Sequence, residues 1–88
     1  MKLREEFILH EANGSQVLVA TGKARFSGMV RCNRSAAAIV ECLMRGASEA
    51  EICDSLERRF DAPRSVIAAD VGRVLAQLRD IGAIDDDA

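Results

Sequence analysis

The first third of the chain alternates between apolar and polar positions with the period of two that is typical of β-strands. The alternation covers Phe7–Ala12 and Gln16–Ala20. Between these segments lies Asn13-Gly14, a pair that favours a two-residue hairpin because both residues tolerate positive φ angles. A second turn is expected around residues 21–23, and a third short strand over Gly28–Cys32. The pattern therefore predicts a three-stranded antiparallel sheet.

From Asn33 onward the apolar residues recur at helical spacing. In the first helical segment they are Ala36, Ile39, Val40, Leu43 and Met44. Asn33 is a good N-cap, because its side-chain oxygen can accept a free N–H of the first turn. Gly46 fits the left-handed position just past the end of the helix.

A second helix is expected behind Ser48-Glu49-Ala50-Glu51. This sequence is a capping box, in which the Ser hydroxyl and the Glu carboxylate each accept a free backbone N–H. The apolar residues that follow are Ile52, Cys53, Leu56 and Phe60. Only Ala47 separates this box from Gly46, so the first two helices must turn sharply against each other.

A third helix is expected between Pro63, which suits its first position, and Gly82, which stops it. Its apolar stripe consists of Ile67, Val71, Val74, Leu75, Leu78 and Ile81. Ile84 can fold back onto the last turn, whereas the acidic residues 85–88 are expected to be frayed and solvated. Three strands followed by three helices on one face make an α+β fold, similar to a winged helix-turn-helix.

Composition narrows the possible functions. The chain has 88 residues, 49% of them hydrophobic, and a net charge of −2. This length favours one domain over residues 1–88, with a modest core and little room for an enclosed active site. No apolar run is long enough for a membrane span, and the start is unlike a signal peptide, so we expect a cytoplasmic protein.

The residues that could do chemistry are few. Cys32, Cys42 and Cys53 form no CxxC pair and are odd in number, which favours buried reduced thiols over a metal site or a disulfide framework. His10, the only histidine, has no recognisable Asp or Cys partner in the sequence. We therefore expect no catalytic residue, no metal and no cofactor.

Several segments, taken in order, resemble the PqqD family. They are Cys32-Asn33-Arg34-Ser35-Ala36, the helix from Ile39 to Gly46, the capping box with Ile52 and the run to Phe60, and the stretch from Asp70-Val71 to Gly82-Ala83-Ile84. The likeness covers the chain from about Phe7 to Ile84. Cys32 stands where the family favours Leu. Val40 stands where an aromatic residue is common, and so leaves room that a neighbour must fill.

The resemblance implies a precursor-peptide recognition element rather than an enzyme. Such a domain binds the leader segment of a ribosomally synthesised peptide and presents it to a modifying enzyme, often a radical S-adenosylmethionine protein. In the family the leader lies between the third strand and the third helix. The resemblance fixes neither the product, a quinone cofactor or another modified peptide, nor the oligomeric state.

The same groove can be argued from the residues. An extended peptide can add a strand to an open sheet edge, here formed by Gly28, Met29, Val30 and Arg31. The third helix supplies the opposite wall. Its favoured flank carries Val66, Asp70, Arg73 and Gln77, next to Val74 of the stripe. The other flank, with Ala68, Gly72 and Arg79, is a poorer wall.

Two alternatives remain at this point. Asp70, Arg73 and Gln77 also fit an ordinary solvated face, with Asp70 and Arg73 paired at i,i+3. A winged-helix DNA-binding regulator is the other alternative, but its third helix would need a basic face. In this chain Arg64, Arg73 and Arg79 are offset by Asp70 and Asp80, and Lys23 and Arg25 would be the only cations of the wing. We therefore expect no nucleic-acid partner.

Overall fold

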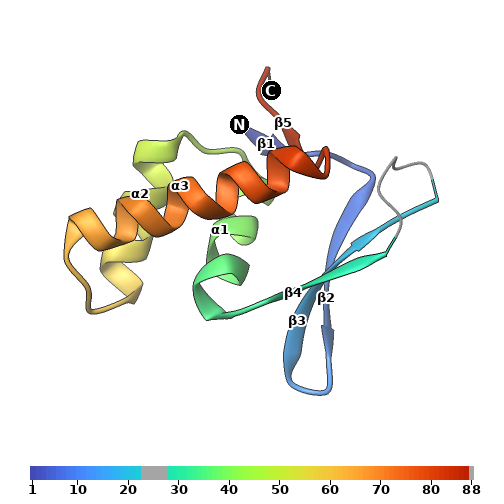
Figure 1. The fold of residues 1–88 in the computed structure, drawn as a ribbon, viewed down its shortest axis with the longest axis horizontal. Helices are drawn as coiled ribbons and strands as arrows, with labels where there is room; N and C mark the ends of the chain where they lie inside the picture. Colours follow the sequence, from blue (N-terminus) through green and yellow to red (C-terminus); the bar gives the residue numbers. More distant parts are fainter. Residues whose placement is uncertain (23–27, 88) are drawn as a thin grey trace.

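The computed structural model describes residues 1–22 and 28–87 (Figure 1). Lys23 and Arg25, the cations of the expected wing, lie outside the described residues. The elements, in chain order, are β1 (Lys2–Leu3), β2 (Phe7–Ala12), β3 (Ser15–Ala20), β4 (Met29–Cys32), α1 (Arg34–Arg45), α2 (Glu49–Arg59), α3 (Arg64–Asp80) and β5 (Ile84–Asp85). The expected α+β arrangement, an antiparallel three-stranded sheet followed by three helices, is confirmed.

The main sheet has the strand order β2-β3-β4, with both pairs antiparallel. Asn13 and Gly14 connect β2 to β3 with φ angles of 51° and 78°. Positive φ at both central residues is the property that suits this pair to a tight hairpin. The hairpin sets the register in which Leu9 pairs with Leu18, and β3 in turn pairs Leu18 with Val30.

The first two helices begin at the expected caps. The Asn33 side chain accepts a hydrogen bond from the N–H of Ala36, and Gly46 follows α1 with a φ of 85°. At α2 the capping box is complete, since the Glu51 N–H donates to the Ser48 hydroxyl over 3.1 Å and the Ser48 N–H donates to the Glu51 carboxylate over 2.8 Å. The Ser48 N–H, together with the Ser48 hydroxyl, stabilises the Glu51 carboxylate and holds its pKa below the ordinary value.

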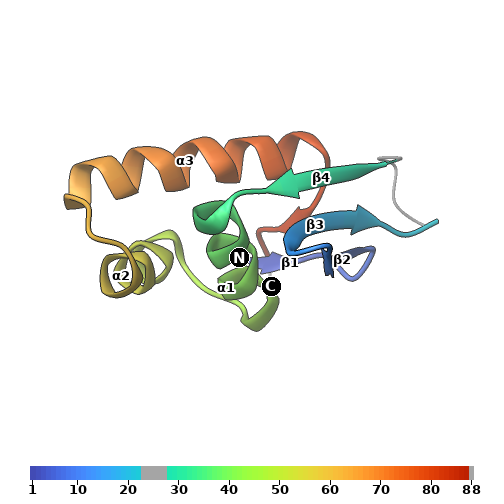
Figure 2. The same ribbon diagram turned by 90° about the horizontal axis from the view of Figure 1, so that it is seen from below.

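Helix α3 begins one position later than expected. Pro63 has extended backbone angles and is the cap residue, so its carbonyl accepts the N–H groups of Val66 and Ile67. The helix lies beside α2 and α1 and extends over β4 (Figure 2). No described helix is long and apolar enough to cross a lipid bilayer.

One hydrophobic core joins the sheet to the helices. Phe7 and Leu18 come from the sheet and meet fully buried residues of the helices, namely Ile39, Val40, Leu43, Ile52, Val71 and Leu75. The expected stripe of α3 is buried from Ile67 to Leu78, while Ile81 is only partly covered. Fully burying a side chain of this size stabilises the fold by about 1.5–3 kcal/mol.

A second, two-stranded sheet forms where the two ends of the chain meet, and it was not expected. β1 and β5 pair antiparallel, with Lys2 opposite Asp85 and Leu3 opposite Ile84. Arg79 donates to the Asp86 carboxylate over 2.9 Å, which lowers the pKa of Asp86. The structure therefore differs from the frayed tail expected from residue 85 onward, because backbone pairing and an ion pair hold Asp85 and Asp86.

We expect Ser48→Ala to lower the free energy of unfolding by about 1 kcal/mol, because it removes one bond of the capping box and loosens the other. Urea unfolding at neutral pH measures this loss. Since the box lowers the folded-state pKa of Glu51, its contribution is present above the ordinary carboxyl pKa and is lost as the pH falls through the folded value. The difference between variant and parent should therefore shrink in acid. Ser65→Ala, at an exposed position of α3, is the matched control, and equal stability of the two variants would contradict this account.

Candidate functional site

Strand β4 has one open edge, because β3 occupies its other side. The phase of its hydrogen bonds follows from one contact, in which the Ala20 N–H donates to the Gly28 carbonyl over 3.3 Å. In an antiparallel ladder, bonded and non-bonded pairs alternate. The bonded pairs beyond Ala20 are thus Leu18 with Val30 and Gln16 with Cys32. The backbone N–H and C=O groups of Met29 and Arg31 consequently face the open edge.

Successive side chains of β4 point to opposite faces of the sheet. Val30 and Cys32 share the face of Leu18, which belongs to the core, and both are partly buried against it. Met29 and Arg31 are exposed on the opposite face. An added strand would thus bond to Met29 and Arg31. The residue of that strand opposite Val30 would point to the core side.

A cavity of about 300 Å³ opens on that core side, between β4, α1 and α3. Its wall is formed by Val30, Arg31, Cys32, Ala36, Val40, Val74, Gln77, Leu78 and Ile81. Figure 2 shows α3 running beside β4, with α1 beyond the end of the strand. The wall is apolar except for Arg31 and Gln77, and both of these are exposed. The site is an apolar hollow with the Gln77 amide at its mouth, while the Arg31 side chain extends from the other face of β4.

Small side chains make this hollow possible. Ala36 is partly buried in the first turn of α1, and Val40, one turn later, is fully buried. Neither reaches far towards α3, so space remains between the helices and the strand. The room beside Val40, which a neighbour was expected to fill, instead remains as part of the cavity.

The structure brings together some of the expected site residues and separates others. Val30, Arg31, Val74 and Gln77 line the cavity, whereas Gly28 and Met29 lie along the open edge next to it. Val66, Asp70 and Arg73 lie nearer the start of α3, outside the cavity wall. Val66 is 56% exposed, and Arg73 donates to the Asp70 carboxylate. The i,i+3 pair is thus present.

Five residues of the wall were not expected there: Cys32, Ala36, Val40, Leu78 and Ile81. All of them belong to the apolar patterns of the strand and the two helices, which indicate burial but not which part of the buried surface borders a cavity. The small size of Ala36 and Val40 was the available signal.

Each arginine of α3 is already paired with a carboxylate. Arg64 donates to Asp54 over 2.6 Å and to Glu57 over 2.7 Å, which raises its pKa. Arg73 pairs with Asp70, and Arg79 with Asp86. Exposed pairs of this kind contribute at most about 1 kcal/mol each, but they neutralise the helix. Helix α3 therefore does not present the basic face that DNA binding requires.

The cysteines are unpaired thiols, with Cys42 and Cys53 buried and Cys32 partly exposed in the cavity wall. The Cys32 thiol donates to the Val30 carbonyl over 3.8 Å, and burial raises its pKa. Within residues 1–22 and 28–87, no three His, Cys, Asp or Glu side chains lie close enough to hold a metal ion. His10 is exposed on β2.

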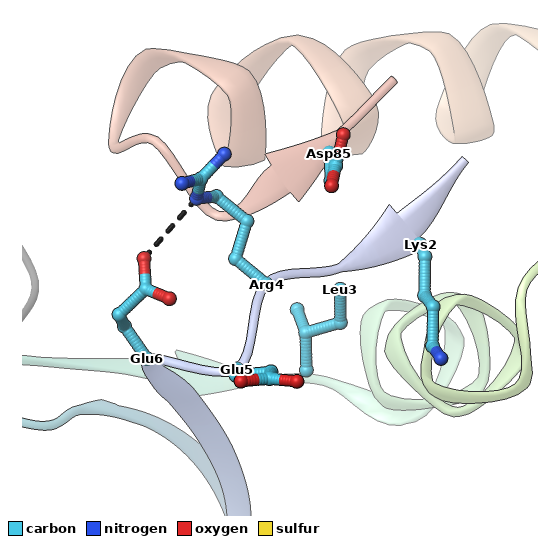
Figure 3. A pocket seen from close by; sticks show the side chains of 6 residues that line it. All are labelled: Lys2, Leu3, Arg4, Glu5, Glu6 and Asp85. Atoms are coloured by element: carbon cyan, nitrogen blue, oxygen red, sulfur yellow. Dashed lines mark hydrogen bonds and ion pairs between the residues drawn. The ribbon is translucent and has the colours of Figure 1, made fainter. Parts of the chain in front are cut away.

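A second hollow, of about 270 Å³, lies at the turn between β1 and β2 (Figure 3). It is lined by Lys2, Leu3, Arg4, Glu5, Glu6 and Asp85. Arg4 and Glu6 pair over 3.1 Å, and the Lys2 side chain points away from them. The charges are mixed and do not converge on one point, so the cavity beside β4 is the better candidate site.

Comparison with known proteins gives one family match and two solved structures of similar fold. The family model described as coenzyme PQQ synthesis protein D (PqqD) matches residues 7–84. A solved lasso peptide synthetase B1, complexed with the leader peptide, is 24% identical with a TM-score of 0.75, and the alignment covers 93% of each chain. TbiB1 in complex with the TbiA(beta) leader peptide is 18% identical with a TM-score of 0.75, covering 97% of this chain and 100% of that one. No curated protein matches the chain.

We expect Cys32 to be the first cysteine to react with iodoacetamide, because it alone of the three is partly exposed. Its reaction at pH 7.5 should be slower than that of free cysteine, since a raised pKa leaves less thiolate. Mass spectrometry of peptides from timed samples identifies the modified residue, and Cys32→Ser should abolish the early phase. Modification of Cys42 or Cys53 before Cys32 would contradict the described packing.

Proposed function

Because the chain belongs to the PqqD family, we propose that it binds the leader segment of a ribosomally synthesised precursor peptide, presents it to a peptide-modifying enzyme, such as a radical S-adenosylmethionine protein, and catalyses nothing itself. The observation that carries this proposal is the apolar cavity beside the open edge of β4. Two solved proteins of similar fold are described in complex with leader peptides, which supports the same function here.

The leader adds to β4 as a further strand. Its backbone bonds to the N–H and C=O groups of Met29 and Arg31, the two residues whose polar groups face the open edge. Its residue opposite Val30 then points into the cavity. Backbone pairing provides affinity for any extended segment, while the cavity selects the side chain.

The cavity favours one large apolar side chain as the main anchor. Its volume of about 300 Å³ lies at the lower end of the range of roughly 300–1,000 Å³ for ligand pockets. Burying such an anchor contributes about 1.5–3 kcal/mol. At the mouth, the exposed Gln77 amide can bond to the leader backbone.

The leader continues from the cavity along the flank of α3. Gln77, Arg73, Asp70 and Val66 follow one another at spacings of four and three residues, so they share this flank. Val66 lies eleven residues before Gln77, about 16 Å along the helix axis. About five extended residues span that distance. Val66, 56% exposed, offers a second apolar contact, while Arg73 is held by Asp70.

The expected affinity is micromolar, about −8 kcal/mol. Two or three buried anchors and the strand hydrogen bonds favour binding, but ordering a leader of about ten residues costs on the order of 1 kcal/mol per residue. A carrier that hands its peptide to another protein needs such a moderate affinity, because it must also release the peptide.

Ala36→Leu tests the cavity. The larger side chain should fill the space between α1 and α3, so that leader affinity falls at least about 10-fold, or about 1.4 kcal/mol. Stability should stay the same or rise, because the added atoms fill empty space and leucine costs little helix propensity relative to alanine. Isothermal titration calorimetry with the leader of a precursor peptide encoded beside this chain measures the affinity, and urea unfolding measures the stability.

Ala68→Leu is the matched control, because Ala68 is exposed on the other flank of α3 and outside the cavity wall. It should bind the leader as the parent does. If Ala36→Leu also binds with parental affinity, the cavity is not the anchor site. If the parent itself gives no heat with any leader from the neighbourhood, the proposed function fails.

Amide hydrogen exchange tests the strand addition. In the free chain the amides of Val30 and Cys32 should exchange slowly, because they bond to β3, while those of Met29 and Arg31 should exchange fast. Leader binding should protect the amides of Met29 and Arg31 from exchange.

The amide chemical-shift changes that the leader causes should cluster at residues 28–32 and 66–77. Changes confined to α1 or to the Asn13-Gly14 hairpin would place the peptide elsewhere.

A further inference from the structure

An apolar row crosses the outer face of the sheet, on the side away from the core. Ile8 pairs with Val19, and Val19 pairs with Met29, so the three side chains lie next to one another on three strands. Ile8 is 54% exposed and Met29 is 64% exposed. They are two of the four large apolar residues exposed in the described part of the chain.

A second row of side chains lies next to the first on the same face of the sheet. It consists of His10, Val17 and Arg31 in register. Val17 is buried but does not belong to the core cluster, which agrees with its place on the outer face between two longer side chains. Among the residues that the structure describes, no carboxylate pairs with Arg31. The two rows form what we call the outer patch: Ile8, His10, Val17, Val19, Met29 and Arg31.

We propose that the outer patch is the docking surface for the peptide-modifying enzyme, whose complementary surface has an apolar centre and a carboxylate opposite Arg31. This inference rests on the proposed function, because the leader takes part in the surface. It assigns a role to the face of the sheet opposite the leader cavity.

The geometry of β4 connects the outer patch to the leader. A leader strand bonded to Met29 and Arg31 places its residues opposite these two on the outer face, since directly paired residues share a face. The Ile8–Val19–Met29 row and the His10–Val17–Arg31 row then each gain one leader side chain. An enzyme that docks here contacts the carrier and the leader together, and it binds the loaded carrier more tightly than the empty one.

Size and charge favour this occupant over a second copy of the chain. A contact about a two-fold axis would enclose the Arg31 side chains of both copies in one small contact, and the patch contains no carboxylate to pair with them. The patch also has only six residues, whereas a stable interface usually takes about 20–30 residues from each side. A transient partner needs less contact area than a stable dimer, and its carboxylate opposite Arg31 would pair with that charge.

Ile8→Glu tests the proposal with the carrier, the precursor peptide and the modifying enzyme encoded beside it. Ile8 lies on β2, two strands from the open edge, so leader affinity should stay within about 2-fold of the parent. Affinity of the leader-loaded carrier for the enzyme, measured by surface plasmon resonance, should fall at least 10-fold. Met44→Glu, at a residue of α1 that is 49% exposed, is the matched control and should bind both partners as the parent does. Ile8→Thr keeps a good strand former at this position and covers the possibility that glutamate unfolds β2.

The outcomes separate the two proposals. If Ile8→Glu and Ile8→Thr bind the leader and also bind the enzyme with parental affinity, the outer patch is not the docking surface. The proposal that the chain binds a leader would then still stand. If the enzyme binds the leader-loaded carrier and the empty carrier with equal affinity, it does not contact the carrier and the leader together. Absence of leader binding in the parent would refute the proposed function itself. Self-association of the parent in sedimentation experiments, abolished by Ile8→Glu, would show that a second copy occupies the patch.

Discussion

Strand β4 can accept a partner on only one side, because β3 occupies the other. The hydrogen-bond phase set by Gly28 and Ala20 decides which residues keep free polar groups, and these are Met29 and Arg31. The same phase turns Val30 and Cys32 towards the core and Met29 and Arg31 away from it. If β4 shifted by one residue relative to β3, Met29 and Arg31 would turn towards the core and Val30 and Cys32 away from it. The Arg31 side chain would then take the place of Val30 in the cavity wall. The long β2–β3 hairpin, buried through Phe7 and Leu18, holds this register.

The cavity reflects a compromise between packing and binding. Filling it with larger side chains at positions 36 and 40 would add apolar contacts within the protein, and unfilled space in a core costs stability. The chain instead places Ala36 and Val40 in the cavity wall, while Ile39 and Leu75, on the same two helices, are fully buried in the core. This empty volume lies where β4, α1 and α3 meet, and a ligand side chain can supply the missing contacts.

Local signals in the sequence were sufficient for most of the fold. Asn13-Gly14, Asn33, Gly46 and the Ser48 capping box each act within a few residues, and each appears in the structure as expected. The pairing of β1 with β5 was missed because strands of two residues show no periodicity, and their pairing joins the two ends of the chain.

The site was harder to read from the sequence than the fold. The resemblance to the PqqD family and the open edge of the third strand predict the groove between β4 and α3, but the helical pattern marks Leu78 and Ile81 only as core residues. A helical stripe cannot show where a core gives way to a cavity, because that depends on side chains of other elements, here Ala36 and Val40. For the same reason the sequence pattern predicts one continuous wall from Val66 to Gln77, although of this flank only Gln77 borders the cavity.

The meeting of the two ends of the chain has a consequence for how this fold can be used. β1 and β5 lie side by side, and the carbonyl of Met1 accepts the N–H of Ala47, so the N-terminus is fixed to the helical part (Figure 1). Neither strand contributes a residue to the cavity beside β4. A fold whose ends emerge together can be inserted into a longer polypeptide with little distortion. The same binding unit could therefore be carried inside a larger enzyme, where its tether would replace the docking step by a high effective concentration of the bound peptide.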